Sequence, residues 1–228
     1  VMVKAQNISD LVEAVIDNAL KHVVFDGWSD KILKKVCLEL QLDEIEVSEV
    51  FPRGAIDLAV AFHRRDDERF LLQFTKSNDD QSNQRVRDRI ELAINARLAL
   101  ADQNKEAVKR SLSLFTTPFY LHEGTRALWN TADKIWIAIG DDTKDLNWYS
   151  KRLILSSVYS SVLIFWLEDD SKNFLETKGF IKRRINDVMK IEKFKSKIKK
   201  SSLWNDFFRK FEVASADIIK SKEGFPGW

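Results

Sequence analysis

Apolar residues recur every three or four positions along almost the whole chain, and this spacing constrains the fold more than any other feature. Such a recurrence places them on one face of an α-helix, whereas a half-buried strand would alternate. Glycine and proline, which interrupt helices and form tight turns, number only 7 and 3 of the 228 residues. The sequence therefore predicts an all-α protein of about ten helices and argues against sandwiches and barrels.

The limits of the expected helices follow from the residues that end them. Asp26-Gly27-Trp28 separates the first two, Pro52 stops the third, and Gly140 suits the position just after a helix. The helices are expected at residues 10–22, 30–42, 44–50, 54–74, 84–101, 104–115, 123–139, 145–168, 171–190 and 202–220. They divide the chain into an N-terminal part (1–74), a helical body (75–190) and a basic linker with a last amphipathic helix (191–228).

The N-terminal part has the layout of a helix-turn-helix module: three short helices that precede a longer bundle. Residues 39–50 would contain its recognition helix, and they hold five acids but no lysine or arginine. Because duplex DNA carries a negative charge at every phosphate, favourable contacts with basic side chains supply much of a DNA-binding protein's affinity. We therefore expect a module that does not bind nucleic acid.

Catalytic and metal-binding patterns are absent from the sequence. The residues three positions before His22, His63 and His122 are not glutamates, so no Glu-x-x-His pair for a di-iron site exists. His63 with Asp66, beside two arginines, is typical of a solvated charge cluster. The single cysteine, Cys37, lies in an apolar helical pattern and is expected to be a buried thiol. The sequence predicts a non-enzymatic binding protein without a metal or cofactor.

The longest uncharged run, residues 153–167, is 15 residues long. That is below the ~18–20 residues that cross a bilayer, so it predicts a buried helix.

The last expected helix is amphipathic and follows a run of lysines. Residues 190–222 contain ten basic and four acidic side chains. Aromatic residues on one helix face with basic residues on the other are typical of a helix that lies on an anionic membrane surface. An ordinary helix docked on the bundle is the alternative. The residues of the expected membrane-binding stripe are Trp204, Phe207, Phe208, Phe211 and Ile218.

An aromatic pair, Trp148 and Tyr149, stands at the start of the most apolar helix. Adjacent residues point about 100° apart on a helix, so both rings do not face the core equally. The pair either caps the core or forms an interface with Asn147 and Arg152, since aromatic residues and arginine are frequent in binding hot spots.

Several short motifs carry a resemblance to a known family. They are Phe25–Ser29, Phe51–Gly54, Leu128-Trp129, Ala132–Trp136, Gly140-Asp141, Asp145–Arg152, Phe180 and Arg183–Met189. With them the sequence resembles the coenzyme Q biosynthesis protein nine family, accessory lipid-binding proteins of ubiquinone synthesis with a TetR-like fold. The Phe51–Gly54 element is similar to the alphaproteobacterial branch, and Lys178 departs from the tryptophan that is usual in the family.

The resemblance implies a homodimer with a TetR-like fold that does not bind DNA. It also implies a pocket for an isoprenoid or phospholipid ligand and a surface patch that binds the demethoxyubiquinone hydroxylase. Carried onto this chain, the patch would comprise Trp148, Tyr149, Asn147, Asp145 and Arg152. For the pocket, the apolar sides of the helices at 123–139 and 145–168 suggest Trp129, Trp136, Leu155, Tyr159 and Val162, although such stripes are usually core.

The function that these features predict is binding and presentation of a ubiquinone precursor to the hydroxylase at a membrane surface. A TetR-type repressor that senses an acyl or prenyl ligand and a structural scaffold dimer are the alternatives. The expected compartment is the bacterial cytoplasm at the inner membrane, with the mitochondrial matrix as the alternative.

Overall fold

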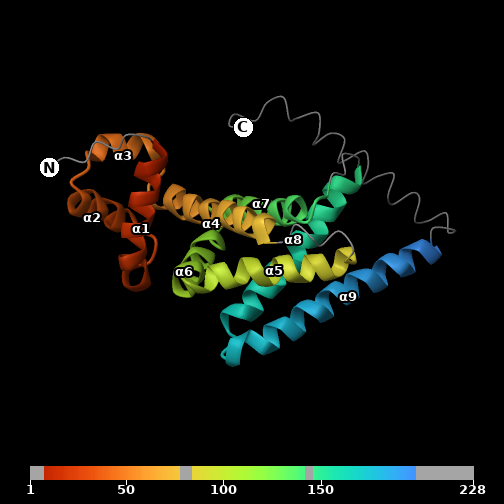
Figure 1. Cartoon of the computed structure of the whole chain (residues 1–228). Helices are drawn as coiled ribbons and strands as arrows, with labels where there is room; N and C mark the ends of the chain where they lie inside the picture. Colours follow the sequence, from red (N-terminus) through yellow and green to blue (C-terminus); the bar gives the residue numbers. More distant parts are fainter. Residues whose placement is uncertain (1–7, 78–83, 142–145, 199–228) are drawn as a thin grey trace. The chain divides into compact units, whose positions relative to one another are not determined.

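The computed structural model describes residues 8–77, 84–141 and 146–198 of the chain. Over these residues it contains nine α-helices, one short 3₁₀ helix and no strand (Figure 1). The helices are α1 (Ile8–Asp26), α2 (Asp30–Leu40), α3 (Glu44–Val50), α4 (Ala55–Ser77), α5 (Val86–Asp102), α6 (Lys105–Phe115), α7 (Leu121–Ala138), α8 (Leu146–Leu167), η2 (Lys172–Phe174) and α9 (Leu175–Ile198).

The all-α prediction is confirmed, and each of the first nine expected helices corresponds to one of α1–α9. The expected helix at 202–220 and the membrane-binding stripe lie outside the described residues. Among the described helices, none combines the length and the apolar character that a membrane span needs.

The chain divides into two compact units, residues 1–182 and 183–228, and α9 crosses the boundary between them. The domain limits expected after residues 74 and 190 stay predictions.

Helices α1, α2 and α3 form the N-terminal module and lie together at one end of α4 (Figure 1). The Asp43 carboxylate caps α3 by accepting from the backbone N–H of Ile45 at 2.8 Å. Val36 and Cys37 of α2 are buried, which confirms the prediction of a buried thiol.

The Phe51–Gly54 element connects this module to the helical body. Gly54 has a φ of +66°, and a Cβ there would stand 2.2 Å from the Oδ1 atom of Asp30. That oxygen accepts the first backbone N–H of α4, from Ala55, at 2.9 Å. Arg53 donates to Asp57 on α4 and to Glu123 on α7. A glycine is therefore required where the α2 carboxylate meets the start of α4.

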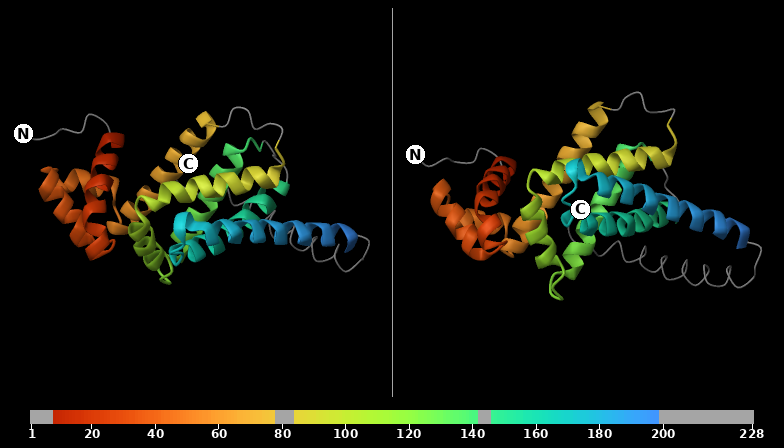
Figure 2. Two further views of the ribbon diagram at one scale, coloured as in Figure 1. Left: turned by 60° about the horizontal axis from the view of Figure 1, so that its bottom comes forward. Right: turned by 90° about the horizontal axis from the view of Figure 1, so that it is seen from below.

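Helix α7 is the centre of the body and packs mainly against α4 and α8, while α5 packs against α4 (Figure 2). The N-terminal module packs on α4 and α6 through α1, and the indole N–H of Trp28 donates to the carbonyl of Ala107 on α6 at 3.0 Å. The Trp28 ring lies 5.4 Å from that of Phe62 on α4. Gly140 follows the end of α7 with a φ of +75°, as expected for a residue after a helix.

Helix α8 buries one face, which includes Leu155, Tyr159, Val162 and Trp166. Its Phe165 ring stacks on Phe180 of α9, with the ring centres 4.4 Å apart. Lys178, the departure from the family pattern, is exposed to solvent. A charged side chain at that position is therefore solvated and needs no buried partner.

Candidate functional site

A cavity of about 210 Å³ lies among α4, α5, α6, α7 and α8. Two of its lining residues, Leu121 and Ile164, are 57 % and 56 % exposed, and they mark its mouth. Most of the wall is apolar: Ala101, Val108, Leu112, Phe115, Leu121, Ala127, Leu128, Leu163 and Ile164. The volume is below the ~300–1,000 Å³ of ordinary ligand pockets, so it fits a small ring or a short stretch of a longer tail.

A buried arginine, Arg97 of α5, lines this cavity and is only 2 % exposed. Its Nε donates to the Asp67 carboxylate at 2.8 Å, and its Nη1 lies 3.9 Å from the Asp66 carboxylate. The Thr131 hydroxyl, also in the cavity wall, donates to Asp67 at 3.0 Å. Burial raises the pKa of both aspartates, and the charge of Arg97 opposes that shift. One cation therefore faces two carboxylates.

Two uncharged polar groups, His63 and Tyr159, share the cavity wall. Burial, together with the charge of Arg97, lowers the pKa of His63 to about 3, so its imidazole is neutral. Because the Ser111 hydroxyl donates to the Val108 carbonyl, it accepts from His63 Nε2, which lies 2.6 Å away. Burial raises the pKa of Tyr159 to about 12, so the phenol keeps its proton at neutral pH. The polar part of the wall thus offers hydrogen bonds without surplus positive charge.

The predicted solvated charge cluster around His63 is wrong. Arg65, Asp66 and Asp67 are buried, and Arg65 bonds Asp17 of α1 at 2.6 Å. The reason is that α4 packs against α1, α5 and α7, so most of its surface is covered. Partners from α1 and α5 compensate the buried charges.

The sequence interpretation missed Arg97 and its two aspartates as components of the site. Their pairing joins positions 30 residues apart, which no local pattern reveals. A signal was nevertheless present on α4. Asp66 stands four residues from Phe62 and from Phe70, so it shares their face, and a carboxylate in an apolar stripe requires a buried partner.

The structure distributes the five predicted lipid-binding residues over different surroundings. Tyr159 lines the cavity. Leu155 and Val162 are buried on α8, and Trp136 is buried with the ammonium group of Lys151 5.2 Å from its ring centre. Trp129 belongs to the aromatic cluster described next. Lipid contact by these five residues stays a prediction.

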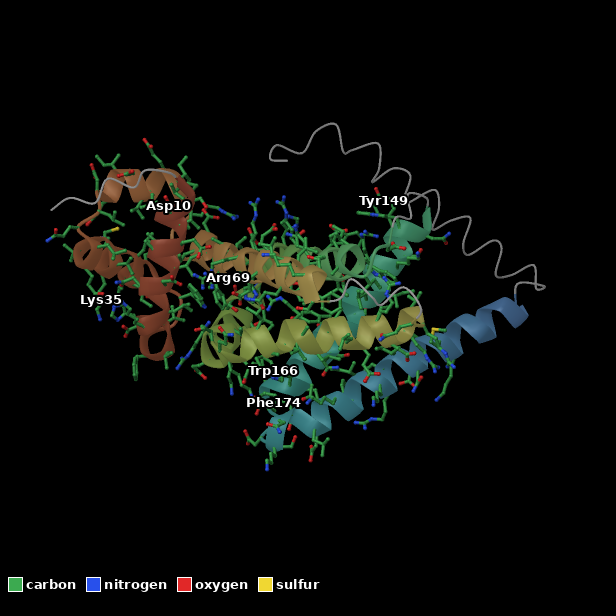
Figure 3. The ribbon with its side chains drawn as sticks, in the orientation of Figure 1. Asp10, Lys35, Arg69, Tyr149, Trp166 and Phe174 are labelled. Atoms are coloured by element: carbon green, nitrogen blue, oxygen red, sulfur yellow. The ribbon has the colours of Figure 1, made fainter. Side chains whose placement is uncertain are left out.

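We use the term aromatic cluster for Trp129 of α7 with Trp148 and Tyr149 of α8. The Trp148 ring centre lies 5.9 Å from that of Trp129 and 4.7 Å from that of Tyr149, which meets it edge-on at 76°. All three rings are half-buried. Figure 3 labels Tyr149 near the first turn of α8 and Trp166 toward its other end. The cluster therefore has both a packed side and a solvent side.

Arg152 lies beneath the aromatic cluster rather than beside it at the surface. It is 2 % exposed, and its guanidinium carbon is 3.9 Å from the ring centre of Trp148. Its Nε donates to Asp133 at 2.5 Å, and its Nη1 lies 3.7 Å from the carboxylate of Asp141. Of the other residues of the predicted patch, Asn147 is exposed and Asp145 lies outside the described residues.

A metal centre finds no support in the part of the chain that the structure describes. No group of three or more histidine, cysteine, aspartate or glutamate side chains there is arranged to hold an ion.

Comparison with known proteins shows which proteins this chain resembles. Residues 121–192 match the sequence model of the COQ9 family. The probable ubiquinone biosynthesis protein coq9, mitochondrial, of Dictyostelium discoideum is 25 % identical over 191 residues, which are 82 % of this chain and 62 % of that protein. The resemblance to the COQ9 family is confirmed.

Animal COQ9 proteins give a similar result. The ubiquinone biosynthesis protein COQ9, mitochondrial, of Homo sapiens is 25 % identical over 188 residues, which are 78 % of this chain and 58 % of the human protein. The Drosophila melanogaster protein of the same name is 22 % identical over 92 % of this chain. The chain thus spans about three fifths of the length of the first two COQ9 relatives.

The fold is that of a TetR protein. A TetR transcriptional regulator from Nitrosomonas europaea superposes with a TM-score of 0.60 at 17 % identity, covering 77 % of this chain and 96 % of the regulator. The COQ9 match covers α7 and α8 completely. These two helices carry the aromatic cluster and part of the cavity wall.

Proposed function

We propose that this chain acts in ubiquinone biosynthesis as a non-enzymatic lipid-binding protein. In this proposal it takes up an isoprenoid quinone precursor and presents it to the demethoxyubiquinone hydroxylase. The names of the COQ9 relatives support the pathway. The ligand and the enzyme partner come from the family resemblance and from the chemistry of the cavity and the aromatic cluster.

The observation that carries the proposal is that the two helices of the aromatic cluster, α7 and α8, also form part of the cavity wall. On α7, Leu128 lines the cavity while its neighbour Trp129 belongs to the cluster. On α8, Tyr159 lines the cavity and Trp148 lies about three turns earlier. A ligand held in the cavity and a protein bound at the cluster would therefore both contact the α7–α8 pair.

The composition of the cavity favours an uncharged head group on an apolar chain. Tyr159 and His63 are neutral, and the charge of Arg97 is already opposed by two aspartates. A further anion, such as a fatty-acid carboxylate, would be repelled by those aspartates. A quinone or phenol oxygen instead accepts a hydrogen bond without adding charge. A phospholipid is the alternative ligand, and its phosphate would have to stay outside.

Lipid extraction of the purified protein tests the proposal directly. Mass spectrometry of the extract is expected to find an isoprenoid quinone precursor bound to the wild-type chain. Ala127→Trp, which fills part of the cavity, should lower the amount at least tenfold. Ile137→Trp is the matched control, since Ile137 is exposed on the same helix and does not line the cavity. Absence of any isoprenoid from several wild-type preparations would contradict the proposal.

A DNA-binding repressor is the second candidate, because the fold is shared with a transcriptional regulator. The acidic side chains of α3 argue against it: Glu44, Glu46 and Glu49 are all exposed, where DNA phosphates would repel them. We expect no shift of promoter DNA in a gel at moderate salt. A sequence-specific shift that the lipid extract releases would favour the repressor.

Membrane contact and dimerisation complete the proposal. Flotation with anionic liposomes should depend on Trp204, Phe207 and Phe208, and changing all three to serine should abolish it. Sedimentation equilibrium is expected to give a homodimer. The relatives' names support a mitochondrial location for this chain, the second of the two compartments expected from the sequence.

A further inference from the structure

We infer that Arg152 is a positioning residue that holds the Trp148 ring in the orientation presented to the partner. The inference rests on the proposed function for the identity of that partner. The observation behind it is that the buried Arg152 guanidinium stacks on the half-buried Trp148 ring.

Trp148 is held by contacts on several sides. The Arg152 guanidinium lies 3.9 Å from its ring centre, and the rings of Trp129 and Tyr149 lie 5.9 and 4.7 Å away. The Arg152 Nη1 also donates to the backbone carbonyl of Trp148 at 3.2 Å, one helical turn earlier. A guanidinium in this position restricts the side-chain torsions of Trp148 and still leaves part of the ring accessible.

The guanidinium is itself held by carboxylates from outside α8. Asp133, on α7, accepts from its Nε at 2.5 Å, and Asp141, just beyond Gly140, lies 3.7 Å from its Nη1. Asp141 also accepts from the neighbouring Lys151 at 2.6 Å. The orientation of Trp148 therefore depends on the end of α7 as well as on α8.

Arginine is required for this arrangement because its planar fork stacks on a ring and bonds carboxylates at the same time. A lysine is a point charge on a flexible stem and does not provide both contacts in this geometry. Arg152→Lys should therefore keep the positive charge but only part of the order of the Trp148 ring.

A ring that is already ordered before binding does not lose that freedom when the partner binds. Freezing one side chain changes affinity by several-fold. Arg152→Met is therefore expected to weaken binding of purified demethoxyubiquinone hydroxylase about three- to tenfold. Asp133→Asn, which keeps an acceptor but removes the charge, should have a smaller effect in the same direction. Arg126→Met is the matched control, because Arg126 is exposed on α7.

Fluorine NMR of the full chain labelled with fluorotryptophan tests the positioning without any partner. The chain has seven tryptophans, and Trp148→Phe assigns the line of Trp148 by its disappearance. In Arg152→Met and Asp133→Asn this line should move toward the shift of an unstructured tryptophan, while the line of the buried Trp166 stays. An unchanged Trp148 line in both variants, each shown to be folded by circular dichroism, would overturn the inference.

A double-mutant cycle with the hydroxylase separates this inference from the proposed function. If Arg152 acts through Trp148, then Trp148→Ala with Arg152→Met should bind no more weakly than Trp148→Ala alone. Fully additive losses would show that Arg152 acts elsewhere and would overturn the inference. If Trp148→Ala leaves hydroxylase affinity unchanged, the proposed partner site is wrong, while the fluorine NMR result still decides whether Arg152 orders the ring.

Discussion

Arg97 and Arg152 are both 2 % exposed, and each faces two aspartates, one at hydrogen-bond distance and one almost 4 Å away. Their surroundings differ. The carboxylates that face Arg97 are 2 % and 4 % exposed, whereas those that face Arg152 are 10 % and 29 % exposed. The first group lies at the cavity wall and the second beneath a half-buried aromatic cluster.

The difference shows how the same combination, one arginine with two aspartates, serves two purposes. Around Arg97 water is excluded, so its charge needs carboxylate partners inside the fold. Around Arg152 water reaches part of the carboxylates, so the same pairing costs less to disturb. What it supplies there is the orientation of a ring. The comparison predicts a graded series of effects.

The largest effect is expected for Arg97→Met, which leaves Asp66 and Asp67 buried without their cation. Removing one partner of a buried ion pair costs about 3–5 kcal/mol of the free energy of unfolding. Urea denaturation followed by circular dichroism measures it. Adding Asp67→Asn to Arg97→Met should recover part of the loss, because the amide carries no charge. A loss below about 1 kcal/mol would mean that the two aspartates are already neutral in the folded protein.

A pH-dependent effect is expected from His63. Its folded-state pKa of about 3 lies below the ordinary 6.5, so the unfolded chain takes up this proton first as the pH falls. The stability contributed by neutral His63 is complete above pH 6.5 and is lost as the pH falls toward 3. Between pH 6.5 and 4.5 the loss is about 2–3 kcal/mol.

His63→Gln provides the comparison for this titration, since glutamine does not ionise and still donates to Ser111. The free energy of unfolding of the variant should fall less steeply than that of the wild type over this pH range. Because the pKa values of Asp66 and Asp67 are raised in the fold, their protonation opposes this loss of stability as the pH falls. Both proteins contain the two aspartates, so the comparison isolates His63. Parallel curves would show that His63 titrates normally in the fold.

A smaller loss of stability is expected for Arg152→Met. Asp133 remains partly solvated, and Asp141 keeps Lys151 as a partner at 2.6 Å. The free energy of unfolding should therefore fall by about 1–2 kcal/mol, clearly less than for Arg97→Met. The same urea experiment tests it. Equal losses in the two variants would remove the distinction between the two arginines.

The smallest effect is expected for a partly exposed ion pair. Lys134 and Glu68 join α7 to α4 at 2.8 Å, but their side chains are 25 % and 46 % exposed. Lys134→Met should change the free energy of unfolding by less than about 1 kcal/mol, because solvent and salt screen such a pair. A larger loss would mean that exposure does not set the scale for the ion pairs of this fold.

The sequence by itself determined the helices and most of their limits. Helical spacing, the turn at Gly27, the stop at Pro52 and the glycine after α7 act over a few residues, so they can be identified without knowing the rest of the chain. The acidic character of residues 39–50 and the family resemblance also belong to the sequence. The fold class followed from these local signals.

Only the tertiary structure decided which charges are buried and what they face. Arg97 meets Asp67 across 30 residues, and Arg152 meets Asp133 across 19. Spacing within one helix placed Arg152 near Trp148, but it did not show that the guanidinium lies beneath the ring. The reason is physical. Periodicity assigns a residue to a face of its own helix, whereas packing of α4, α5, α7 and α8 determines which faces meet and which of them water reaches.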